Sequence, residues 1–312
     1  MLKQTIKRWR DTSPLMEPLC RVLRKTVPLP QSVWQHLPFT GIADFTVAGR
    51  RVKMRHFGAE IENSLFWAGY GHDWEATTLL AWERLAGESR VIFDVGANTG
   101  LFAVAACAAN PGARVHAFEP MPVIAGRLAQ NVALNHFPVT VHQLAVSDND
   151  GTEQIRAMAA AHEYSASFEQ MDWMDADNVT LVEVKVARLD GVIAASGDRP
   201  DLIKLDVERH EPQALRGLWA GLGDGPPPAM VIEILDDEVA LAVREQIEGR
   251  GYTAFVIREG VGITCGELHA EPGTMNWLLI PAEAKGFGAE LIAKGGMTHA
   301  ELIAGRKLNR MP

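Results

Sequence analysis

The chain has 312 residues, of which 47% are hydrophobic, so it is long enough to fold around a sizeable core in one large domain or two small ones. Its net charge of −9 at pH 7 provides no overall basic field, which argues against nucleic acid as a partner. The three cysteines, Cys20, Cys107 and Cys265, include no Cys-x-x-Cys pair, which argues against a disulfide framework or a structural zinc site. We therefore expect a globular, cytoplasmic protein.

The first ten residues are typical of a short basic helix, with Leu2, Ile6 and Trp9 on one face and four Lys and Arg residues elsewhere. No apolar segment follows these charges, so the stretch does not resemble a secretory signal. A basic amphipathic helix can touch a membrane surface, but one this short more often packs on its own domain. The longest apolar run has nine residues, against about 20 in a membrane-spanning helix, so we expect a soluble protein.

Residues 1–73 are expected to form an N-terminal extension. Five prolines divide its first part into short helices. Residues 42–47 and 52–57 flank a Gly-containing turn, which predicts a β-hairpin. We expect this extension to cover the mouth of the next domain and to influence the choice of substrate.

Residues 74–283 alternate regularly between strand and helix patterns, beginning with a helix over 74–85, and residues 284–312 are expected to form a C-terminal tail. This alternation predicts a doubly wound α/β fold, with a mostly parallel sheet whose ligands bind at the carboxyl ends of the strands. An inserted antiparallel pair is expected over 152–157 and 179–188. The strands of the main sheet are predicted at 91–95, 114–118, 139–146, 201–207, 230–235, 252–257 and 277–280.

The segment from Val91 to Gly100 combines a buried strand, a turn with two glycines and the start of a helix. Asp94, Gly96, Asn98 and Gly100 are the candidate cofactor-binding residues of this turn. A dinucleotide site would require Gly-x-Gly-x-x-Gly, whereas Ala97 and Asn98 follow Gly96 and the third glycine is absent. An acid entering a turn with two glycines fits S-adenosylmethionine better, since its methionine end carries an ammonium group. A purely structural turn is the alternative.

Glu119 ends the second predicted strand, 19 residues beyond Gly100. In this class of fold an acid at that position binds a ribose, because a carboxylate accepts hydrogen bonds from both neighbouring hydroxyls. Asp148 follows the third strand, where an adenine would lie, although a plain turn explains it equally well.

Lys204, Asp206 and Glu208 alternate along a strand expected at the centre of the sheet, where charges are costly unless they are paired or functional. Glu233 ends the next strand and should lie near Asp206. Asp206, Glu208, His210 and Glu233 are therefore the candidate catalytic residues, with Asp206 or His210 as the base that takes a proton from an acceptor. His210 could equally begin a helix without a chemical role. A divalent metal is a further possibility for such acids, but their spacing matches no recognisable ligand set.

Several motifs together resemble the FkbM family of S-adenosylmethionine-dependent methyltransferases over residues 74–281. They are Asp94 to Gly100, Ala117 to Pro120, the paired Asn131 and Asn135, Leu189-Asp190, Lys204 to Glu208 with Glu211, and Asn276 to Pro281. The resemblance implies a class I Rossmann-like fold whose last strand is antiparallel. It also implies O-methylation of a sugar, a glycan or a polyketide-type metabolite.

Carried over by position, the resemblance places Asp94, Gly96, Asn98 and Gly100 at the methionine end of the cofactor and Glu119 at its ribose. It places residues 206–211 on the catalytic side. Arg209 departs from the pattern, because the family commonly has glycine there, and the larger residue is expected to alter the acceptor pocket or the turn. A nicotinamide-dependent oxidoreductase and a non-catalytic methyltransferase-like binding module remain the alternatives. The residue types alone do not determine the acceptor, O- against N- or C-methylation, or the oligomeric state.

Overall fold

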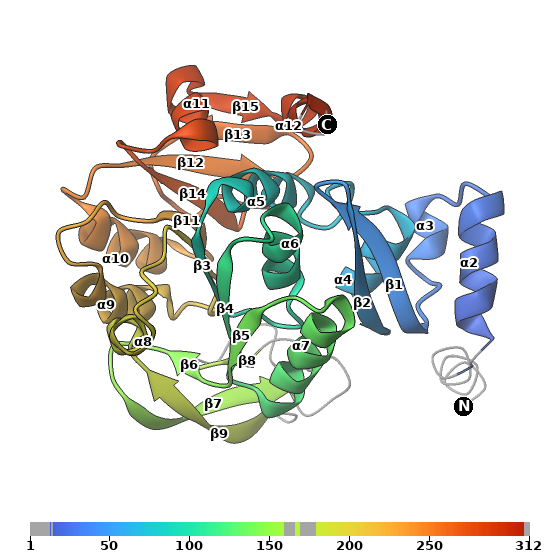
Figure 1. The fold of residues 1–312 in the computed structure, drawn as a ribbon, viewed down its shortest axis with the longest axis horizontal. Helices are drawn as coiled ribbons and strands as arrows, with labels where there is room; N and C mark the ends of the chain where they lie inside the picture. The colour runs from blue at the N-terminus through green and yellow to red at the C-terminus, as the bar shows by residue number, and fades with distance from the viewer. Residues whose placement is uncertain (1–12, 14, 159–165, 169–178, 309–312) are drawn as a thin grey trace.

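The computed structural model describes residue 13 and residues 15–158, 166–168 and 179–308. Its centre is a nine-stranded sheet with helices on both faces, in the order β15-β13-β12-β14-β11-β10-β3-β4-β5 (Figure 1). Five strands run parallel: β5 (Val139–His142), β4 (Arg114–Phe118), β3 (Val91–Val95), β10 (Leu202–Leu205) and β11 (Ala229–Glu233). This confirms the predicted α/β fold.

The other edge of the sheet is built from antiparallel pairs. Its strands are β14 (Asn276–Pro281), β12 (Tyr252–Arg258), β13 (Gly262–Cys265) and β15 (Gly296–Thr298). β14 lies between β11 and β12 and is antiparallel to both, as expected for the closing strand. β13 and β15 extend the sheet beyond the predicted elements, and residues expected as a C-terminal tail supply β15.

Two hydrophobic layers separate the sheet from its helices, because the side chains of each buried strand alternate between its faces. One face carries α5 (Ala76–Glu88), α6 (Leu101–Ala109), α7 (Pro122–Asn135), α11 (Gly286–Lys294) and α12 (His299–Leu308). The other carries α8 (Leu189–Ser196), α9 (Glu211–Leu222) and α10 (Asp237–Ile247).

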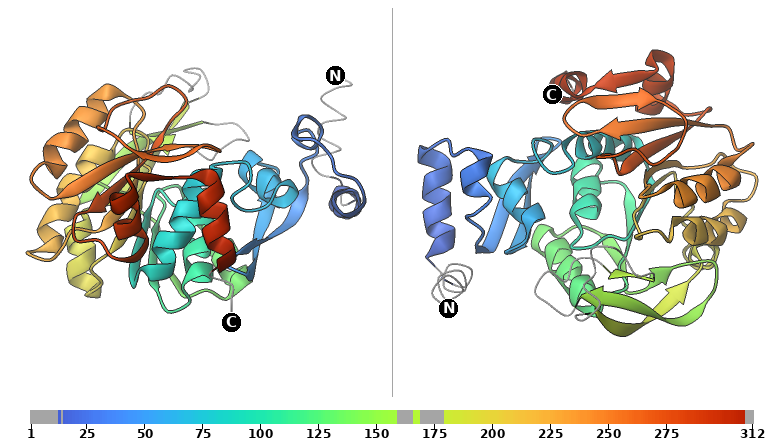
Figure 2. Two further views of the ribbon diagram at one scale, coloured as in Figure 1. Left: turned by 90° about the horizontal axis from the view of Figure 1, so that it is seen from above. Right: turned by 180° about the vertical axis from the view of Figure 1, so that it is seen from behind.

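A second sheet of four strands lies beside β5, in the order β6-β9-β7-β8 (Figures 1 and 2). Its strands are β6 (Ala145–Val146), β7 (Gly151–Met158), β8 (Ala166–Ser167) and β9 (Val179–Ala187). The antiparallel pairing of β7 with β9 matches the predicted inserted pair. The strand predicted over 139–146 is divided in two, because the backbone turns at Leu144, whose N–H donates to the carbonyl of His142.

The N-terminal extension consists of α2 (Met16–Thr26), α3 (Gln31–Trp34), the hairpin of β1 (Thr40–Val47) and β2 (Arg50–Phe57), and α4 (Glu60–Trp67). The hairpin was predicted, and its two-residue turn uses positive φ angles at Ala48 and Gly49. The helix expected over the first ten residues lies outside the described residues.

Two asparagines of α7 connect the extension to the sheet domain. The Oδ1 atoms of Asn131 and Asn135 accept hydrogen bonds from the backbone N–H groups of Arg55 and Lys53, at 2.7 and 2.9 Å. The Asn131 amide also donates to the carbonyl of Thr99 in the glycine turn, at 2.8 Å. One side chain therefore bridges the hairpin and the predicted cofactor loop.

Arg306 of α12 makes the corresponding connection from the C-terminal end. Its guanidinium pairs with Glu83 at 2.9 Å and donates to the carbonyl oxygens of Tyr70 and Thr46, at 3.1 and 2.8 Å. Helix α12 thus connects α5 with the end of β1 and with Tyr70.

Candidate active site

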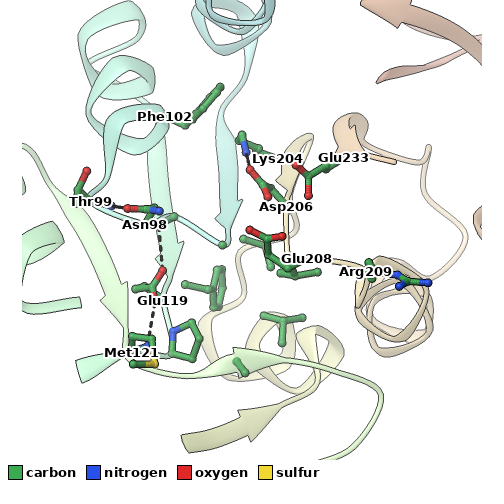
Figure 3. A pocket seen from close by; sticks show the side chains of 18 of the residues that line it. Asn98, Thr99, Phe102, Glu119, Met121, Lys204, Asp206, Glu208, Arg209 and Glu233 are labelled. Carbon is green, nitrogen blue, oxygen red and sulfur yellow. Dashed lines mark hydrogen bonds and ion pairs between the residues drawn. The ribbon is translucent and has the colours of Figure 1, made fainter. Parts of the chain in front are cut away.

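A cavity of about 650 Å³ opens at the carboxyl ends of the parallel strands. Gly96 follows β3, Glu119 follows β4, Asp206 follows β10 and Glu233 ends β11, and all four line this cavity. Figure 3 shows Glu119 on one side and Asp206 with Glu233 on the other. The topology therefore brings together the two groups of acids that the sequence analysis separated into cofactor and catalytic residues.

The turn after β3 requires its first glycine for a close approach between strands. Gly96 has a φ angle of +79°, and a Cβ atom there would lie 1.7 Å from the carbonyl oxygen of Asp206. The N–H groups of Gly96 and Ala97 both donate to the carbonyl of Phe118, at 3.1 and 2.9 Å. These contacts hold the turn between β4 and β10.

Gly100, predicted to bind the cofactor, does not line the cavity. It precedes α6 with a φ angle of +92°, and a Cβ atom would lie 2.3 Å from Cδ1 of Leu128 in α7. The second glycine thus allows α6 and α7 to pack closely.

Glu119 is buried against the glycine turn, where two backbone groups hold its carboxylate. Oε2 accepts from the N–H of Asn98 at 3.0 Å and Oε1 accepts from the N–H of Met121 at 2.9 Å (Figure 3). Burial raises the pKa of Glu119 to about 7, although these two hydrogen bonds favour the ionised form. A carboxylate oxygen accepts two hydrogen bonds, so each oxygen retains capacity for one donor from the cavity.

The wall next to Glu119 is mainly apolar and suits a flat aromatic ring. Phe118, Met121, Leu144, Ala145 and Val146 line it. Asp148, expected near an adenine, is not part of this wall. Its carboxylate instead pairs with Arg216 at 2.8 Å, which agrees with the alternative of a structural turn residue.

Lys204 lies at the opposite end of the cavity and forms an ion pair with Asp206. Its Nζ also lies 4.4 Å from the ring centroid of Phe102. Burial opposes the positive charge, but the carboxylates of Asp206, Glu75 and Asp94 outweigh it and hold the pKa of Lys204 above its usual range.

Asp94 does not line the cavity, in contrast to the expectation that it faces the ligand. It is fully buried in β3 and lies in register with Lys204 on β10. Burial raises the pKa of Asp94 to about 7, and Lys204 acts in the opposite direction. Residues in register on neighbouring strands project from the same face of a sheet, so the side chain of Asp94 lies beside that of Lys204.

Glu233 is 9% exposed and lines the cavity beside Asp206 (Figure 3). Burial raises its pKa well above the usual value, and the charges of Asp206, Glu211 and Glu208 add to this. Among the described residues, its Oε2 atom has no hydrogen-bond partner. Glu208 also lines the cavity, whereas Glu211 lies behind it and accepts a hydrogen bond from the N–H of Val207 at 2.9 Å.

His210 does not line the cavity. Its Nε2 lies 2.9 Å from the hydroxyl of Ser147 and its ring stacks on Phe168, with 4.2 Å between ring centroids. It directly precedes α9, which agrees with the alternative of a helix-start residue. Burial lowers the pKa of His210 to about 4.

Arg209 occupies a backbone position that explains the glycine usual in the family. Glu208 and Arg209 have φ angles of +55° and +77°, a region that costs a non-glycine residue about 1–3 kcal/mol. Arg209 lines the cavity, and its Nε pairs with Asp236 at 2.7 Å. Asp236 in turn caps α10, since its Oδ1 accepts from the N–H groups of Glu238 and Val239.

The sequence analysis expected the N-terminal extension to cover the mouth of the next domain, but it singled out none of the cavity residues that precede β3. Ile61, Trp74 and Glu75 line the cavity from elements that precede β3. Burial raises the pKa of Glu75 to about 8, and within the described part of the chain its Oε2 has no hydrogen-bond partner. No sequence signal marked this residue, because the turn that places it, with a φ angle of +43°, lacks glycine.

The described residues contain no group of three or more His, Cys, Asp and Glu residues that is arranged to hold a metal ion. None of their helices is long and apolar enough to cross a membrane.

The doubly wound sheet, the glycine turn after its first parallel strand and the acid after its second form a nucleotide-cofactor site of the kind found in class I methyltransferases and in nicotinamide-dependent enzymes. A family model described as the methyltransferase FkbM domain matches residues 94–253. The chain therefore belongs to the FkbM methyltransferase family, as the motifs indicated, and the nicotinamide-dependent alternative is set aside.

Two relatives share part of this chain. This chain is 34% identical over 194 residues to the 31-O-demethyl-FK506 methyltransferase FkbM of Streptomyces tacrolimicus, and the match covers 52% of this chain and 72% of the relative. The chain is 31% identical over 141 residues to the hexuronic acid methyltransferase AglP of Haloferax volcanii, and this match covers 44% of this chain and 53% of the relative. A solved SAM-dependent methyltransferase from Agrobacterium tumefaciens matches 80% of this chain and 78% of its own, with 13% identity and a TM-score of 0.41.

Proposed function

We propose that this protein transfers the methyl group of S-adenosylmethionine to a hydroxyl group of a sugar or another small metabolite. The observation that supports this most directly is the carboxylate of Glu119, which two backbone N–H groups hold in the cavity wall while each oxygen keeps capacity for one more donor. Two neighbouring ribose hydroxyls supply such a pair of donors. The apolar wall from Leu144 to Val146 would then contact the adenine.

The methionine end of the cofactor would extend from the glycine turn toward Lys204 and Asp206. Gly96, Asn98 and Thr99 line this part of the cavity. The acids at this end favour a ligand that carries positive charge, as the ammonium and sulfonium groups of the donor do. When it is bound, the cofactor supplies an electrophilic methyl carbon.

The acceptor would bind among Glu75, Asp206, Glu208 and Glu233, at the end of the cavity away from Glu119. Its oxygen attacks the methyl carbon as the carbon–sulfur bond breaks, and the hydroxyl proton passes to a carboxylate. We assign this base role to Asp206. Burial and the neighbouring acids raise the pKa of Glu233 well above its usual value, which favours the protonated form and suits it to donate a hydrogen bond to the acceptor. His210 is no longer a candidate, because its ring faces Ser147 and Phe168.

The two named relatives support an oxygen acceptor. One is called a 31-O-demethyl-FK506 methyltransferase and the other a hexuronic acid methyltransferase. For this chain we propose an acceptor with several hydroxyl groups, since a cavity wall rich in carboxylates offers many hydrogen-bond acceptors.

Calorimetry and a transfer assay test the proposal separately. We expect the purified protein to bind S-adenosylhomocysteine, and to transfer labelled methyl groups from S-adenosylmethionine to at least one member of a panel of sugars, uronic acids and hydroxylated macrolides. Absence of binding would refute the assigned cofactor site. Binding with transfer only to amines or carbon nucleophiles would retain that site and refute the hydroxyl acceptor.

A further inference from the structure

Glu75 places a carboxyl group in the cavity wall that has only part of its hydrogen-bond partners. The side chain of Asn276 bonds to it, whereas its Oε2 atom has no partner among the described residues. The charge of Lys204 favours the ionised form of Glu75, but those of Asp206 and Glu259 oppose it. The unpartnered oxygen therefore has capacity for a hydrogen bond from a ligand, and a cation is the donor that would best offset its burial.

The charges of the cavity wall are mostly negative. The described residues that line it include six acids and two bases: Glu75, Glu119, Asp206, Glu208, Glu233 and Asp236, with Lys204 and Arg209. Each base already pairs with an acid, Lys204 with Asp206 and Arg209 with Asp236. The donor adds a sulfonium, an ammonium and a carboxylate group, which together carry one positive charge. Carboxyl groups thus remain in excess, and such a wall favours a second ligand that is also positively charged.

Two aromatic rings lie in the same part of the cavity wall as Glu75. Trp74 directly precedes Glu75 and Phe102 belongs to α6, and their ring centroids lie 6.5 Å apart in an edge-to-face arrangement. The ammonium group of Lys204 already lies 4.4 Å from the ring centroid of Phe102 (Figure 3). An indole ring next to a carboxylate suits a further ammonium group, because the ring attracts a cation and the carboxylate accepts its hydrogen bonds.

We propose that the acceptor carries a protonated amino group near its reactive hydroxyl, and that Glu75 and Trp74 bind this amino group. An amino sugar or an aminated polyol has this combination of groups. The inference rests on the proposed function, because it concerns the acceptor of the same reaction. The ammonium group of the donor is assigned to Asp206 and the glycine turn, which leaves Glu75 to the acceptor.

Protonation of the amino group also determines which atom receives the methyl group. A protonated nitrogen has no lone pair, so it cannot attack the methyl carbon. The hydroxyl oxygen attacks instead, the carbon–sulfur bond breaks, and the hydroxyl proton passes to Asp206. The amino group keeps its proton and its hydrogen bond to Glu75 throughout, so it orients the acceptor without taking part in the reaction.

Binding of matched sugars to the protein loaded with S-adenosylhomocysteine tests this inference. Glucosamine, glucose and N-acetylglucosamine differ only in carrying an ammonium, a hydroxyl or a neutral amide group at one ring position. Galactosamine and mannosamine have corresponding neutral counterparts. We expect calorimetry to show that at least one of these amino sugars binds at least about tenfold more tightly than both of its counterparts. If none did so, the inference would be overturned.

Glu75→Gln removes the charge of the carboxyl group and keeps the size of the side chain. It should weaken the binding of that amino sugar at least about tenfold and change the binding of the neutral counterparts by less than about twofold. Glu60→Gln, at an exposed acid of the same extension, is the matched control and should bind all the sugars as the native protein does. Both variants should remain folded and keep the native affinity for S-adenosylhomocysteine. An unchanged preference for the amino sugar in Glu75→Gln would overturn the inference.

Two further measurements separate this inference from the proposed function. Glu75→Gln could weaken the binding of S-adenosylhomocysteine but not that of methylthioadenosine, which lacks the amino-acid end. Glu75 would then bind the donor, and the inference alone would be overturned. After methyl transfer to the amino sugar, NMR should find the new methyl group on oxygen. A methyl group on nitrogen would refute both the inference and the hydroxyl acceptor of the proposed function.

Discussion

Asn131 and Arg55 are 76 positions apart in the chain and joined by a hydrogen bond of 2.7 Å between a helix side chain and a strand backbone. The same side chain donates to Thr99, so the hairpin, α7 and the glycine turn share one fully buried amide. The N-terminal extension is therefore attached directly to the loop that we assign to the cofactor. This attachment gives a structural reason for the asparagine at this position of the motif.

Replacing Asn131 with alanine should lower the free energy of unfolding by about 1–3 kcal/mol, since the buried groups of Arg55 and Thr99 lose their partner. Urea unfolding measures this loss, and hydrogen exchange should show faster exchange at the Arg55 amide. Asn135→Ala is the matched control. Asn135 forms hydrogen bonds with the backbone of Lys53 near the surface, so this substitution should lower the free energy of unfolding by less. Equal losses in the two variants would contradict the bridging role of Asn131.

Replacing Glu119 with glutamine should weaken the binding of S-adenosylhomocysteine about 10- to 100-fold. The NH2 group of the glutamine would face the N–H of either Asn98 or Met121, and two donors form no hydrogen bond. Only the remaining amide oxygen could accept a hydrogen bond from the ribose. Calorimetry measures the affinity, and Glu283→Gln, at an exposed position, controls for the change in charge. An unchanged affinity would show that Glu119 does not bind the ribose.

The free energy of unfolding of the ligand-free protein should fall as the pH rises from 6.5 to 8. Burial raises the pKa of several acids above their usual values of 3.8 or 4.5: Glu62, Asp94 and Glu119 to about 7, and Glu75 and Glu211 to about 8. The folded state then binds more protons than the unfolded state up to these values, so stability is lost as the acids ionise.

Buried histidines act in the opposite direction, mainly at lower pH. Burial lowers the pKa values of His56, His142 and His210 from 6.5 to about 4, so their contribution rises with pH and levels off only about one pH unit above 6.5. Urea unfolding at pH 6.5 and 8 therefore measures the loss caused by the acids less a smaller remaining gain from the histidines. Glu62→Gln should reduce the difference between the two values, and stability that is constant or rises over this range would contradict the assignment.

Replacing Asp206 with asparagine should lower the rate of methyl transfer at least about 100-fold if Asp206 is the base. The affinity for S-adenosylhomocysteine should fall by a smaller factor, because only its ammonium group lies near Asp206, whereas the ribose and adenine sites lie at the other end of the cavity. Single-turnover kinetics with the acceptor identified from the panel measures the rate. Glu238→Gln, at an exposed carboxylate near the rim of the cavity, is the control. If Asp206→Asn transferred methyl groups at a rate similar to that of the native protein, Asp206 would not be the base.

Replacing Gly96 with alanine should destabilise the protein by more than about 3 kcal/mol, since the new methyl group would overlap the carbonyl of Asp206 at a positive φ angle. Gly126→Ala is the matched control. Gly126 lies within α7 with no atom within 4 Å of the added Cβ, so the helix should gain about 0.5–1 kcal/mol. Thermal unfolding of both variants checks the contrast, and similar melting temperatures would refute the role of Gly96.

Local patterns in the sequence were sufficient to predict the central part of the sheet. The apolar run of β3, the glycine turn and the spacing to Glu119 are local features, and they predicted the parallel strands and the place of the cavity. The patterns of the next two strands likewise predicted Asp206 and Glu233 at neighbouring strand ends. At the edge, β13 and β15 are short strands whose pairing depends on contacts distant in sequence, and local periodicity does not show such contacts.

The direction of individual side chains was harder to predict than the elements that carry them. Asp94 and Glu119 both belong to the cofactor motif, but only Glu119 extends past the end of its strand into the cavity. His210 seemed a candidate base from its place among acids, whereas its ring packs against Ser147 and Phe168. Glu75 could not be predicted, because it reaches the cavity through the docking of the N-terminal segment.

The contact of Arg306 with the carbonyl of Thr46 spans 260 positions, and this has a consequence during synthesis. At about 5–20 residues per second, the ribosome needs on the order of 13–50 s to make the intervening chain. The hairpin emerges first and meets α7 well before α12 exists. A nascent chain truncated before Arg306 should therefore hold the hairpin through Asn131 and Asn135 without the Arg306 contact, and it should be cut by protease near Thr46 more readily than the complete chain.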